Sequence, residues 1–350
     1  MSQSWEESSF SERLLDWFDH YGRHDLPWQH PVTPYRVWVS EVMLQQTQVV
    51  TVIPYFERFM TRFPCVESLA SASTDQVLAL WSGLGYYARG RNLHKASQMI
   101  VTDYQGQMPQ QVDELMRLPG IGRSTAHAIL SLAFQQPTAI CDGNVKRVLA
   151  RWLALDAMIE SATAGAVLWR EADRLQSHQR PGDYTQAIMD LGATVCTRTK
   201  PKCESCPISK DCAARLSDRL ETEWPKRSIK ASKQVRYVDQ FLHIRRDGAV
   251  WLEAPSQQTG IWGGLYYFPQ SSLIGGVDKK IQLSSIKHVF THQVWHITPY
   301  VIQLKSGKNM LPLSANGLWY NPNEENQLVA KPAIVDKLLN HWLLQQGSLL

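Results

Sequence analysis

The sequence predicts two domains: a mostly α-helical N-terminal domain and a smaller α+β C-terminal domain. Apolar residues recur at intervals of three and four from the N-terminus to about residue 225, as in helices that pack against a core. A basic segment follows, and after it come short β-type runs and one further helical stretch. A chain of 350 residues, 44% of them hydrophobic, is long enough to bury two cores. We therefore expect domains at residues 1–224 and 236–350, joined by a linker at residues 225–235.

The predicted helices of the first domain rest on apolar spacing and on start signals. The first, at residues 10–21, carries its large apolar side chains on one stripe. Thr33 followed by Pro34 is a typical helix start, an N-cap with proline in the first turn, and predicts a helix through Met43. The remaining predicted helices lie at residues 54–63, 75–82, 87–102, 110–117, 124–135 and 145–155. We expect about ten helices in this domain.

The linker and the second domain have a different composition. Residues 225–236 contain five basic and no acidic residues, which is typical of a linker and would suit contact with a phosphate backbone. Strands are predicted at residues 237–244 and 249–252, and strand-type sequence continues at 285–299 and 317–320. A closing helix at residues 333–344 completes an α+β domain.

The overall charge excludes little. Lys and Arg number 36 and Asp and Glu 32, a net charge of +4 that permits a nucleic-acid partner without requiring one. The N-terminal sequence MSQSWEESSF lacks the cationic start and apolar run of a secretory signal, and no run approaches the ~20 apolar residues of a membrane span. We therefore expect an intracellular protein with no membrane anchor.

A glycine-containing turn, LPGIGRS at residues 118–124, lies between two predicted helices. Glycines allow a tight turn with exposed backbone N–H groups, and the following helix adds the positive end of its dipole. An ordinary helix–helix turn would explain Gly120 and Gly122 by themselves. The Leu-Pro before them and the helix directly after them favour a hairpin that binds DNA phosphates without reading the base sequence.

Four of the six cysteines, Cys196, Cys203, Cys206 and Cys212, form the pattern C-x6-C-x2-C-x5-C. Structural disulfides are uncommon in a reducing compartment, and the close pair Cys203 and Cys206 suits two thiolates on one metal centre. The spacing fits zinc and a [4Fe–4S] cluster alike. The loop at residues 197–202 carries three cations and is a candidate second phosphate contact.

Two carboxylates, Glu41 and Asp142, are candidates for acid–base chemistry. Cleavage of an N-glycosidic bond places positive charge on the sugar, so it needs one ionised carboxylate to stabilise that charge and one protonated acid to assist the leaving base. Two acids in different surroundings can hold these opposite states. Each also has a structural explanation, Glu41 as a solvated helix residue and Asp142 as the cap of the following helix.

Taken in order, LPGIG, DGNVKR and the four cysteines resemble the helix-hairpin-helix superfamily of base-excision DNA glycosylases typified by endonuclease III. The segments SEVMLQQTQV, GLGYYARGRN and CDGNVKRVLAR resemble, more narrowly, the adenine DNA glycosylases of the MutY family. The resemblance is dense over residues 5–225 and continues more loosely to the C-terminus. It implies two helical subdomains with a DNA groove between them, a [4Fe–4S] cluster on the four cysteines, and excision of adenine mispaired with 8-oxoguanine or guanine.

The resemblance also implies catalytic roles. Asp142 would stabilise the oxocarbenium ion, either directly or through a covalent intermediate, with Asn144 beside it. Glu41 would protonate the adenine and then orient or activate water. Trp28 and Gln186 match the adenine pocket, and a glutamine amide can pair with the N6/N7 edge of adenine.

Other matched residues would hold the DNA while a base is flipped out, because extraction of a base is costly and leaves a gap that the enzyme fills. Gln46 matches the side chain that is wedged into the duplex. Leu84 and Tyr86 match residues that stack around 8-oxoguanine. The implied DNA-binding residues are Gln45, Gln46, Thr47, Leu84, Tyr86, Gly120, Gly122, Ser124 and Lys146. Core packing is the alternative explanation for Tyr86 and Trp28.

One position bears on the reaction type. Relatives with strand-cleaving lyase activity carry a lysine in the hairpin, directly after the arginine, that forms a Schiff base with the sugar. This chain has Ser124 there, and a hydroxyl cannot form an imine, so we expect a monofunctional hydrolase. The alternatives are a lyase of the endonuclease III kind that acts on pyrimidine lesions, and a DNA-binding protein without catalysis.

The second domain resembles the Nudix-like C-terminal domain of the same family, in GIWGGLYYFP at residues 260–269 and around His288. Nudix hydrolysis needs a glutamate-rich helix to hold Mg²⁺, and residues 236–350 contain none, so we expect recognition without hydrolysis. Phe290, Thr291 and His292 match a Phe-Ser-His loop that inspects 8-oxoguanine, with threonine keeping the hydroxyl. The implied partner is double-stranded DNA with A:8-oxoguanine or A:G mispairs, bound by a monomer in the bacterial cytoplasm in association with the nucleoid.

Overall fold

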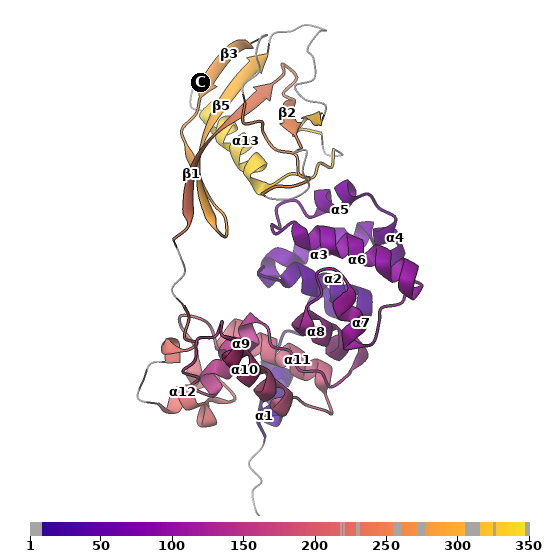
Figure 1. The fold of residues 1–350 in the computed structure, drawn as a ribbon, viewed down its shortest axis with the longest axis vertical. Coiled ribbons are helices and arrows are strands. Elements are labelled where there is room, and N and C mark those ends of the chain that lie inside the picture. Colours follow the sequence, from indigo (N-terminus) through magenta and orange to yellow (C-terminus); the bar gives the residue numbers. More distant parts are fainter. Residues whose placement is uncertain are drawn as a thin grey trace, which may run out of the picture. The chain divides into compact units, whose positions relative to one another are not determined.

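The computed structural model describes residues 9–217, 219, 221–228, 232–254, 261–271, 277–304, 316–324 and 327–346. Contacts between residues divide the chain into two compact units. The first unit contains Met1–Glu67 and Lys95–Lys230, and the second contains Ser68–His94 and Ala231–Leu350. Most helices belong to the first unit and the strands to the second (Figure 1). Within the described ranges, no helix is long and apolar enough to cross a membrane.

The first unit is α-helical, as predicted. Its helices are α1 (Phe10–Tyr21), α2 (Pro34–Leu44), α3 (Val49–Arg62), α7 (Val112–Arg117), α8 (Arg123–Phe134), α9 (Gly143–Trp152), α10 (Ala162–Leu175), α11 (Pro181–Asp190) and α12 (Ala213–Leu216). Helices α4 (Val66–Ala70) and α6 (Ala88–Tyr104) each contain residues of both units, and α5 (Thr74–Leu80) lies in the second unit.

The helix starts follow the cap residues. Ser9 accepts a hydrogen bond from the backbone N–H of Glu12, whose side chain returns one to Ser9 and so closes a capping box on α1. Thr33 caps α2, with Pro34 in the first turn, as predicted. The predicted start of the next helix at residue 54 is wrong: α3 begins at Val49, and Pro54 lies in its second turn, where proline removes a single backbone bond.

Helices α10 and α11 were not among the predicted ranges. The sequence hides α11 because its buried residues include the polar Thr185, Gln186 and Asp190 beside apolar ones, so that no simple stripe marks one face. A π-helical turn, Leu191–Val195, continues α11 and leads to Cys196.

A single hydrophobic core contains residues from both the beginning and the later part of the first unit. Leu14 of α1 is fully buried in the same cluster as Leu149 of α9, Leu168 of α10 and Leu191. Helix α1 contacts α11, and its side chains form ion pairs with residues distant in sequence, Asp19 with Arg180 and Arg13 with Asp211, both at 2.6 Å. The N-terminal helix is therefore built into the part of the fold made by residues 140–211.

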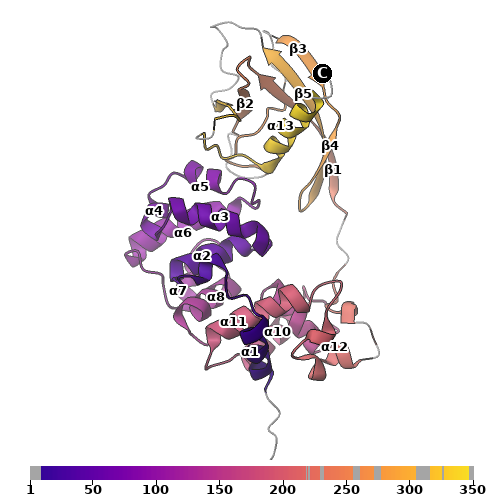
Figure 2. The ribbon, with the colours of Figure 1, turned by 180° about the vertical axis from the view of Figure 1, so that it is seen from behind.

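The second unit contains a mixed sheet. Its strands are β1 (Gln234–Ile244), β2 (Val250–Glu253), β3 (Val277–Gln282), β4 (Ile286–Val289), β5 (Gln293–Leu304) and β6 (Gly317–Tyr320). The order is β3-β5-β1-β2-β6, with β4 also paired to β5. β1 and β5 run parallel, and the other pairs are antiparallel. Helix α13 (Ala333–Gln346) lies against one face of the sheet (Figures 1 and 2).

The predicted strands differ from the observed ones in three places. β1 begins at Gln234, three residues before the predicted strand and inside the predicted linker. The strand-type sequence at residues 285–299 forms a hairpin of β4 and the first half of β5, because residues 290–292 turn the chain. β3 was not predicted.

Candidate functional site

Asp142 sits at the start of α9 as its N-cap. Its backbone is extended, and its Oδ1 accepts hydrogen bonds from the N–H groups of Asn144 (3.0 Å) and Val145 (2.8 Å). Capping thus places the carboxylate at the positive end of the α9 dipole, which favours the ionised form. The structural explanation of Asp142 is correct, and it supports the chemical one.

Glu41 lies on α2 and interacts with Asp142 through charge. Burial, with a smaller contribution from Asp142, raises the pKa of Glu41 to about 8. Burial also raises the pKa of Asp142, but its two N–H bonds and the cations Arg147 and Lys146 act in the opposite direction. With a pKa of about 8, Glu41 keeps its proton at neutral pH, whereas the N–H bonds and cations around Asp142 favour its carboxylate form. The fold therefore brings the two candidate carboxyl groups within electrostatic reach of each other, and their catalytic roles remain a prediction.

Asn144 is held by a residue that the sequence did not single out. Arg147 donates from Nη2 to Asn144 Oδ1 (2.9 Å) and to the carbonyl of Gly192 (2.6 Å), and from Nε to the carbonyl of Cys196 (2.8 Å). A Cβ on Gly192 would lie 2.8 Å from Asn144 Cβ, so only glycine fits at this position. The spacing of three residues between Asn144 and Arg147 on one helix is the signal that could have revealed the contact.

The hairpin that precedes α8 closes as predicted. Gly120 has a φ of +83°, a conformation that favours glycine. A Cβ on Gly122 would meet nothing within 4 Å, so this backbone is open to a close approach. Ser124 Oγ accepts a hydrogen bond from the N–H of Cys141 (3.2 Å), next to Asp142. The hydroxyl at the lyase position therefore holds the segment that carries the carboxylate.

The loop after α2 presents Gln46 outward. Gln46 is exposed and has a φ of +58°, so the chain turns sharply at its tip. Gln45 Nε2 donates to Thr125 Oγ1 of α8 (3.3 Å), and the N–H of Thr47 donates to the Leu44 carbonyl (3.1 Å). These bonds leave Gln46 free to project from a fixed base.

Lys146, on the first turn of α9, is half-buried and acts on the pKa of Asp142.

The two residues assigned to an adenine pocket are both buried. Trp28 lies in a short 3-10 helix and packs edge-on against Phe56, with ring centroids 5.4 Å apart. Gln186 Nε2 donates to Asp190 Oδ1 (2.8 Å). Asp190, which the sequence did not single out, also accepts three bonds from Arg23 at 2.5 to 2.9 Å. In the described part of the chain no hydrogen bond or ring contact joins Trp28 to Gln186, so their common pocket remains a prediction.

Leu84 and Tyr86 lie in the second unit, on the loop between α5 and α6. Leu84 is buried, whereas Tyr86 is 44% exposed and has a φ of +49°. The guanidinium of Arg89 lies 5.3 Å from the Tyr86 ring. Core packing thus explains Leu84 and not the outer face of Tyr86.

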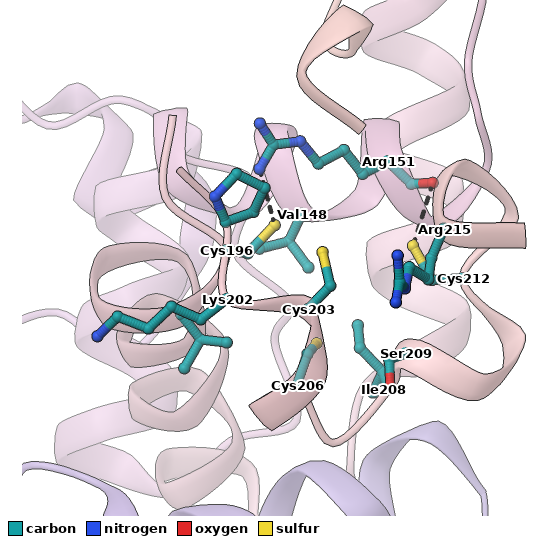
Figure 3. A pocket seen from close by; sticks show the side chains of 12 residues that line it. Val148, Arg151, Cys196, Lys202, Cys203, Cys206, Ile208, Ser209, Cys212 and Arg215 are labelled. Atoms are coloured by element: carbon teal, nitrogen blue, oxygen red, sulfur yellow. Dashed lines mark hydrogen bonds between the residues drawn. The ribbon is translucent and has the colours of Figure 1, made fainter. Parts of the chain in front are cut away.

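The four clustered cysteines surround one cavity. Figure 3 shows Cys196, Cys203, Cys206 and Cys212 around a common space that is also lined by Val148 and Ile208. All four are free thiols. Burial raises the pKa of the Cys206 thiol to about 12, so that thiolates here require a positive partner.

Basic groups border this cavity. Arg151 Nη1 donates to Cys196 Sγ (3.3 Å) and to the Thr197 carbonyl (2.7 Å). Four sulfur donors around an apolar space fit a polynuclear metal cluster. Among the residues that the structure describes, no three His, Cys, Asp or Glu side chains are arranged as a site for a metal ion.

The tip of the hairpin between β4 and β5 carries Phe290, Thr291 and His292. The N–H of Phe290 donates to the Gln293 carbonyl (2.8 Å), which closes the turn. The Phe290 ring packs against Trp295 (5.0 Å) and Trp262 (5.6 Å), whereas Thr291 and His292 are exposed. Phe290 therefore anchors a tip that offers a hydroxyl and an imidazole to solvent.

A hairpin before a helix-capping aspartate, a neutral acid beside it, and four cysteines in one helical unit define a base-excision DNA repair protein of the helix-hairpin-helix class. Residues 39–171 match the HhH-GPD superfamily of base excision DNA repair proteins, and residues 240–341 match the NUDIX domain. A thermostable thymine-DNA glycosylase aligns with a TM-score of 0.54 at 27% identity, over 59% of this chain and 94% of its own. Endonuclease III in a non-covalent DNA complex has the same fold, with a TM-score of 0.50 at 21% identity, over 59% of this chain and 92% of its own.

Proteins with similar sequences show which family within this class the chain belongs to. The adenine DNA glycosylase of Buchnera aphidicola subsp. Acyrthosiphon pisum is 37% identical, over 95% of this chain and 97% of its own. The human adenine DNA glycosylase is 47% identical, over 62% of this chain and 41% of its own. The chain belongs to the adenine DNA glycosylase family.

Proposed function

We propose that this protein is a monofunctional adenine DNA glycosylase, which hydrolyses the N-glycosidic bond of adenine paired with 8-oxoguanine or guanine. The observation that carries the proposal is the pairing of Glu41 with Asp142. The first keeps a proton at neutral pH and the second is capped as a carboxylate, inside a fold whose relatives are named for this reaction. Hydrolysis of the glycosidic bond needs a protonated acid for the leaving base and, at the same time, an ionised carboxylate for the positive charge on the sugar.

In this mechanism the flipped adenine lies between Trp28 and Gln186, within reach of Glu41. Glu41 gives its proton to the base as the glycosidic bond lengthens, and the bonding electrons leave with the base. Asp142 stabilises the oxocarbenium charge, and Asn144, fixed by Arg147, shapes the site beside it. A water molecule then attacks the sugar carbon, directly or after a covalent step on Asp142, and its proton passes to Glu41.

The other assigned residues hold the duplex around the extracted base. Gln46 fills the gap from a fixed loop, and Gly120 and Gly122 with Lys146 contact phosphates. Leu84 and Tyr86 stack around 8-oxoguanine, and the hairpin tip with Thr291 and His292 inspects it.

Ser124 supports hydrolysis without strand cleavage. Its hydroxyl holds the Cys141 N–H and offers no amine for a Schiff base. A pyrimidine-lesion lyase of the endonuclease III kind would need that amine. Efficient trapping of a covalent protein–DNA complex by borohydride would contradict the proposal.

We further propose that Cys196, Cys203, Cys206 and Cys212 bind a [4Fe–4S] cluster. The cluster would fix the basic loop at residues 197–202, which Arg151 already ties to α9. Purified protein should contain iron and sulfide and show a broad visible absorption band. Colourless protein with bound zinc would refute this assignment.

The proposed domains are the catalytic domain at residues 1–224, the linker at 225–235 and the lesion-reading domain at 236–350. We also place the protein on double-stranded DNA in the bacterial cytoplasm, near the nucleoid; the names of the two Buchnera relatives, both adenine DNA glycosylases, support DNA as its substrate. We also propose that it acts as a monomer, which the sedimentation of its complex with a single-mispair duplex would test.

The decisive experiment is base release from duplexes that differ in one pair. The protein should release free adenine opposite 8-oxoguanine and opposite guanine, and leave an alkali-labile site. The Asp142→Asn protein should bind the same duplex without releasing the base. Asp183→Asn, which changes an exposed aspartate on α11, is the matched control and should remain active. Adenine release by Asp142→Asn at the parent rate would favour the alternative in which the site binds DNA without this chemistry.

A further inference from the structure

The Ser68–His94 segment, which carries Leu84 and Tyr86, groups by its contacts with the C-terminal part of the chain. Leu78 of α5 is 1% exposed and belongs to the same core as Leu242 of β1 and Leu338 of α13. Tyr87 packs against this core as well. The segment is therefore part of the body that contains the sheet, although its neighbours in sequence belong to the first unit.

Two hydroxyls join the loop of this segment to one carbonyl of the C-terminal domain. Ser82 Oγ donates to the Lys331 carbonyl oxygen at 2.6 Å, and Tyr87 Oη donates to the same oxygen at 3.1 Å. The N–H of Gly83 in turn donates to Tyr87 Oη at 3.2 Å. Lys331 is itself fixed, since its Nζ lies 2.5 and 2.6 Å from the two carboxylate oxygens of Asp336 on α13.

These hydrogen bonds hold a loop whose backbone adopts unfavourable positive φ angles. Gly83 and Gly85 have φ values of +93° and +77°, and Tyr86 follows at +49°, a region that residues with a side chain rarely adopt. Trp81 Nε1 and Arg89 Nη2 both donate to the Gly85 carbonyl, at 3.1 and 3.2 Å. The conformation that exposes Tyr86 therefore depends on bonds at both ends of the turn.

A third bond connects the segment to the GIWGGLYYFP motif. Arg91 Nη1 donates to the Gly263 carbonyl at 2.8 Å. The motif thus has a physical role in this chain: it receives the first turn of α6. Apolar contact by Leu78 and Tyr87 and hydrogen bonds by Ser82, Tyr87 and Arg91 together make one attachment.

We propose that Ser82 and Tyr87 are positioning residues through which the C-terminal domain sets the Leu84–Tyr86 loop, and so sets how strictly the protein distinguishes 8-oxoguanine from guanine opposite adenine. This rests on the proposed function, in which Leu84 and Tyr86 stack around 8-oxoguanine. The C-terminal domain then reads the lesion by two routes. One is direct, through the exposed tip with Thr291 and His292, and the other acts through the Lys331 carbonyl and the hydroxyls that bind it.

The test is a comparison of single-turnover adenine release from A:8-oxoguanine and A:G duplexes by the parent and by Ser82→Ala, Tyr87→Phe and the double variant. The double variant should lose about tenfold of the preference for 8-oxoguanine, because two hydrogen bonds to one carbonyl are removed. Its rate on A:G should stay within about twofold of the parent. Ser82→Thr, which keeps the hydroxyl, should restore the preference.

Two control variants remove a serine hydroxyl and a tyrosine hydroxyl that do not bond to Lys331. Ser71→Ala deletes a hydroxyl that donates to the local Ser68 carbonyl, and Tyr21→Phe changes a tyrosine that is 75% exposed. Both should keep the parent preference. Melting curves of each variant separate a loss of folded protein from a change in preference.

The outcomes distinguish the two proposals. If the parent releases adenine from neither duplex, the proposed function is wrong. If the parent prefers 8-oxoguanine and the double variant keeps that preference, the role of Ser82 and Tyr87 is refuted. An equal loss of rate on both duplexes would also refute it, because a positioning effect on the lesion side must change the ratio.

Discussion

Replacement of Glu41 by glutamine should stabilise the fold while it abolishes efficient base release, and the stabilisation should grow with pH. The pKa of Glu41 is raised from an ordinary 4.5 to about 8 in the folded protein because its carboxyl is buried near Asp142. Between these values the unfolded chain has released a proton that the folded chain keeps. The free energy of unfolding of the parent therefore falls as pH rises through this window. Glutamine has no such proton, so its contribution does not change with pH.

The magnitude follows from the size of the pKa shift. One pKa unit corresponds to about 1.4 kcal/mol. The destabilisation by Glu41 is near zero below pH 4.5, reaches about 3 kcal/mol at neutral pH, and levels at about 5 kcal/mol above pH 8. These values are upper limits, because the folded protein relaxes around an ionised carboxylate.

Urea unfolding of the parent and of Glu41→Gln at about pH 5, 7 and 8.5 measures this effect. The advantage of the variant should increase by more than about 1 kcal/mol from the lowest to the highest pH. Glu57→Gln, on the exposed side of α3, is the control and should follow the parent. The same pKa predicts that the parent loses adenine release as pH rises through about 8, where the acid form of Glu41 disappears. An equal pH dependence of stability in the parent and Glu41→Gln would refute this assignment of the proton.

Three further substitutions test other parts of the structure. Gly192→Ala places a methyl group 2.8 Å from Asn144 Cβ. It should slow single-turnover adenine release about tenfold or more and lower the free energy of unfolding by about 1–3 kcal/mol. An unchanged rate would contradict the close fit of Gly192 against Asn144. Gln240 of β1 is fully buried, and its amide oxygen and nitrogen have no hydrogen-bond partner among the residues that the structure describes. Gln240→Leu should therefore raise the free energy of unfolding, measured in urea, by about 1–2 kcal/mol; a loss of stability would mean that the amide is satisfied. Asp190→Asn leaves the Arg23 guanidinium with a weaker partner and should cost about 2 kcal/mol or more of the free energy of unfolding, measured in the same way; a negligible change would show that the pair is not stabilising.

Local signals in the sequence predicted those parts of the fold that depend on neighbouring residues. Thr33 with Pro34 marked the start of α2, and Asp142 was recognised as a cap because its side chain bonds to the next residues along the chain. The pair of Glu41 and Asp142 was a hypothesis from chemistry, and the structure brings the two into electrostatic contact. Such features need only the residues themselves and the periodicity around them.

Features that depend on distant partners were missed. Asp190 carries no local signal, because its role comes from Arg23 and Gln186, which meet it only after folding. The grouping of Ser68–His94 by contacts with the C-terminal part of the chain carries no signal in the sequence. Part of it rests on the carbonyl of Lys331, a backbone group that every residue has. Neither periodicity nor composition reports such a bond.

The attachment of α1 has a consequence for the order in which the chain folds during synthesis. The ion-pair partners of α1, Arg180 and Asp211, leave the ribosome more than a hundred and fifty residues after the helix itself. The core that its apolar stripe joins, with Leu14 and Phe18, is made of residues between 128 and 208. The amphipathic N-terminal helix must therefore wait in contact with water or a chaperone while most of the first unit is made. A slow or paused ribosome would lengthen the period in which this helix is open to aggregation.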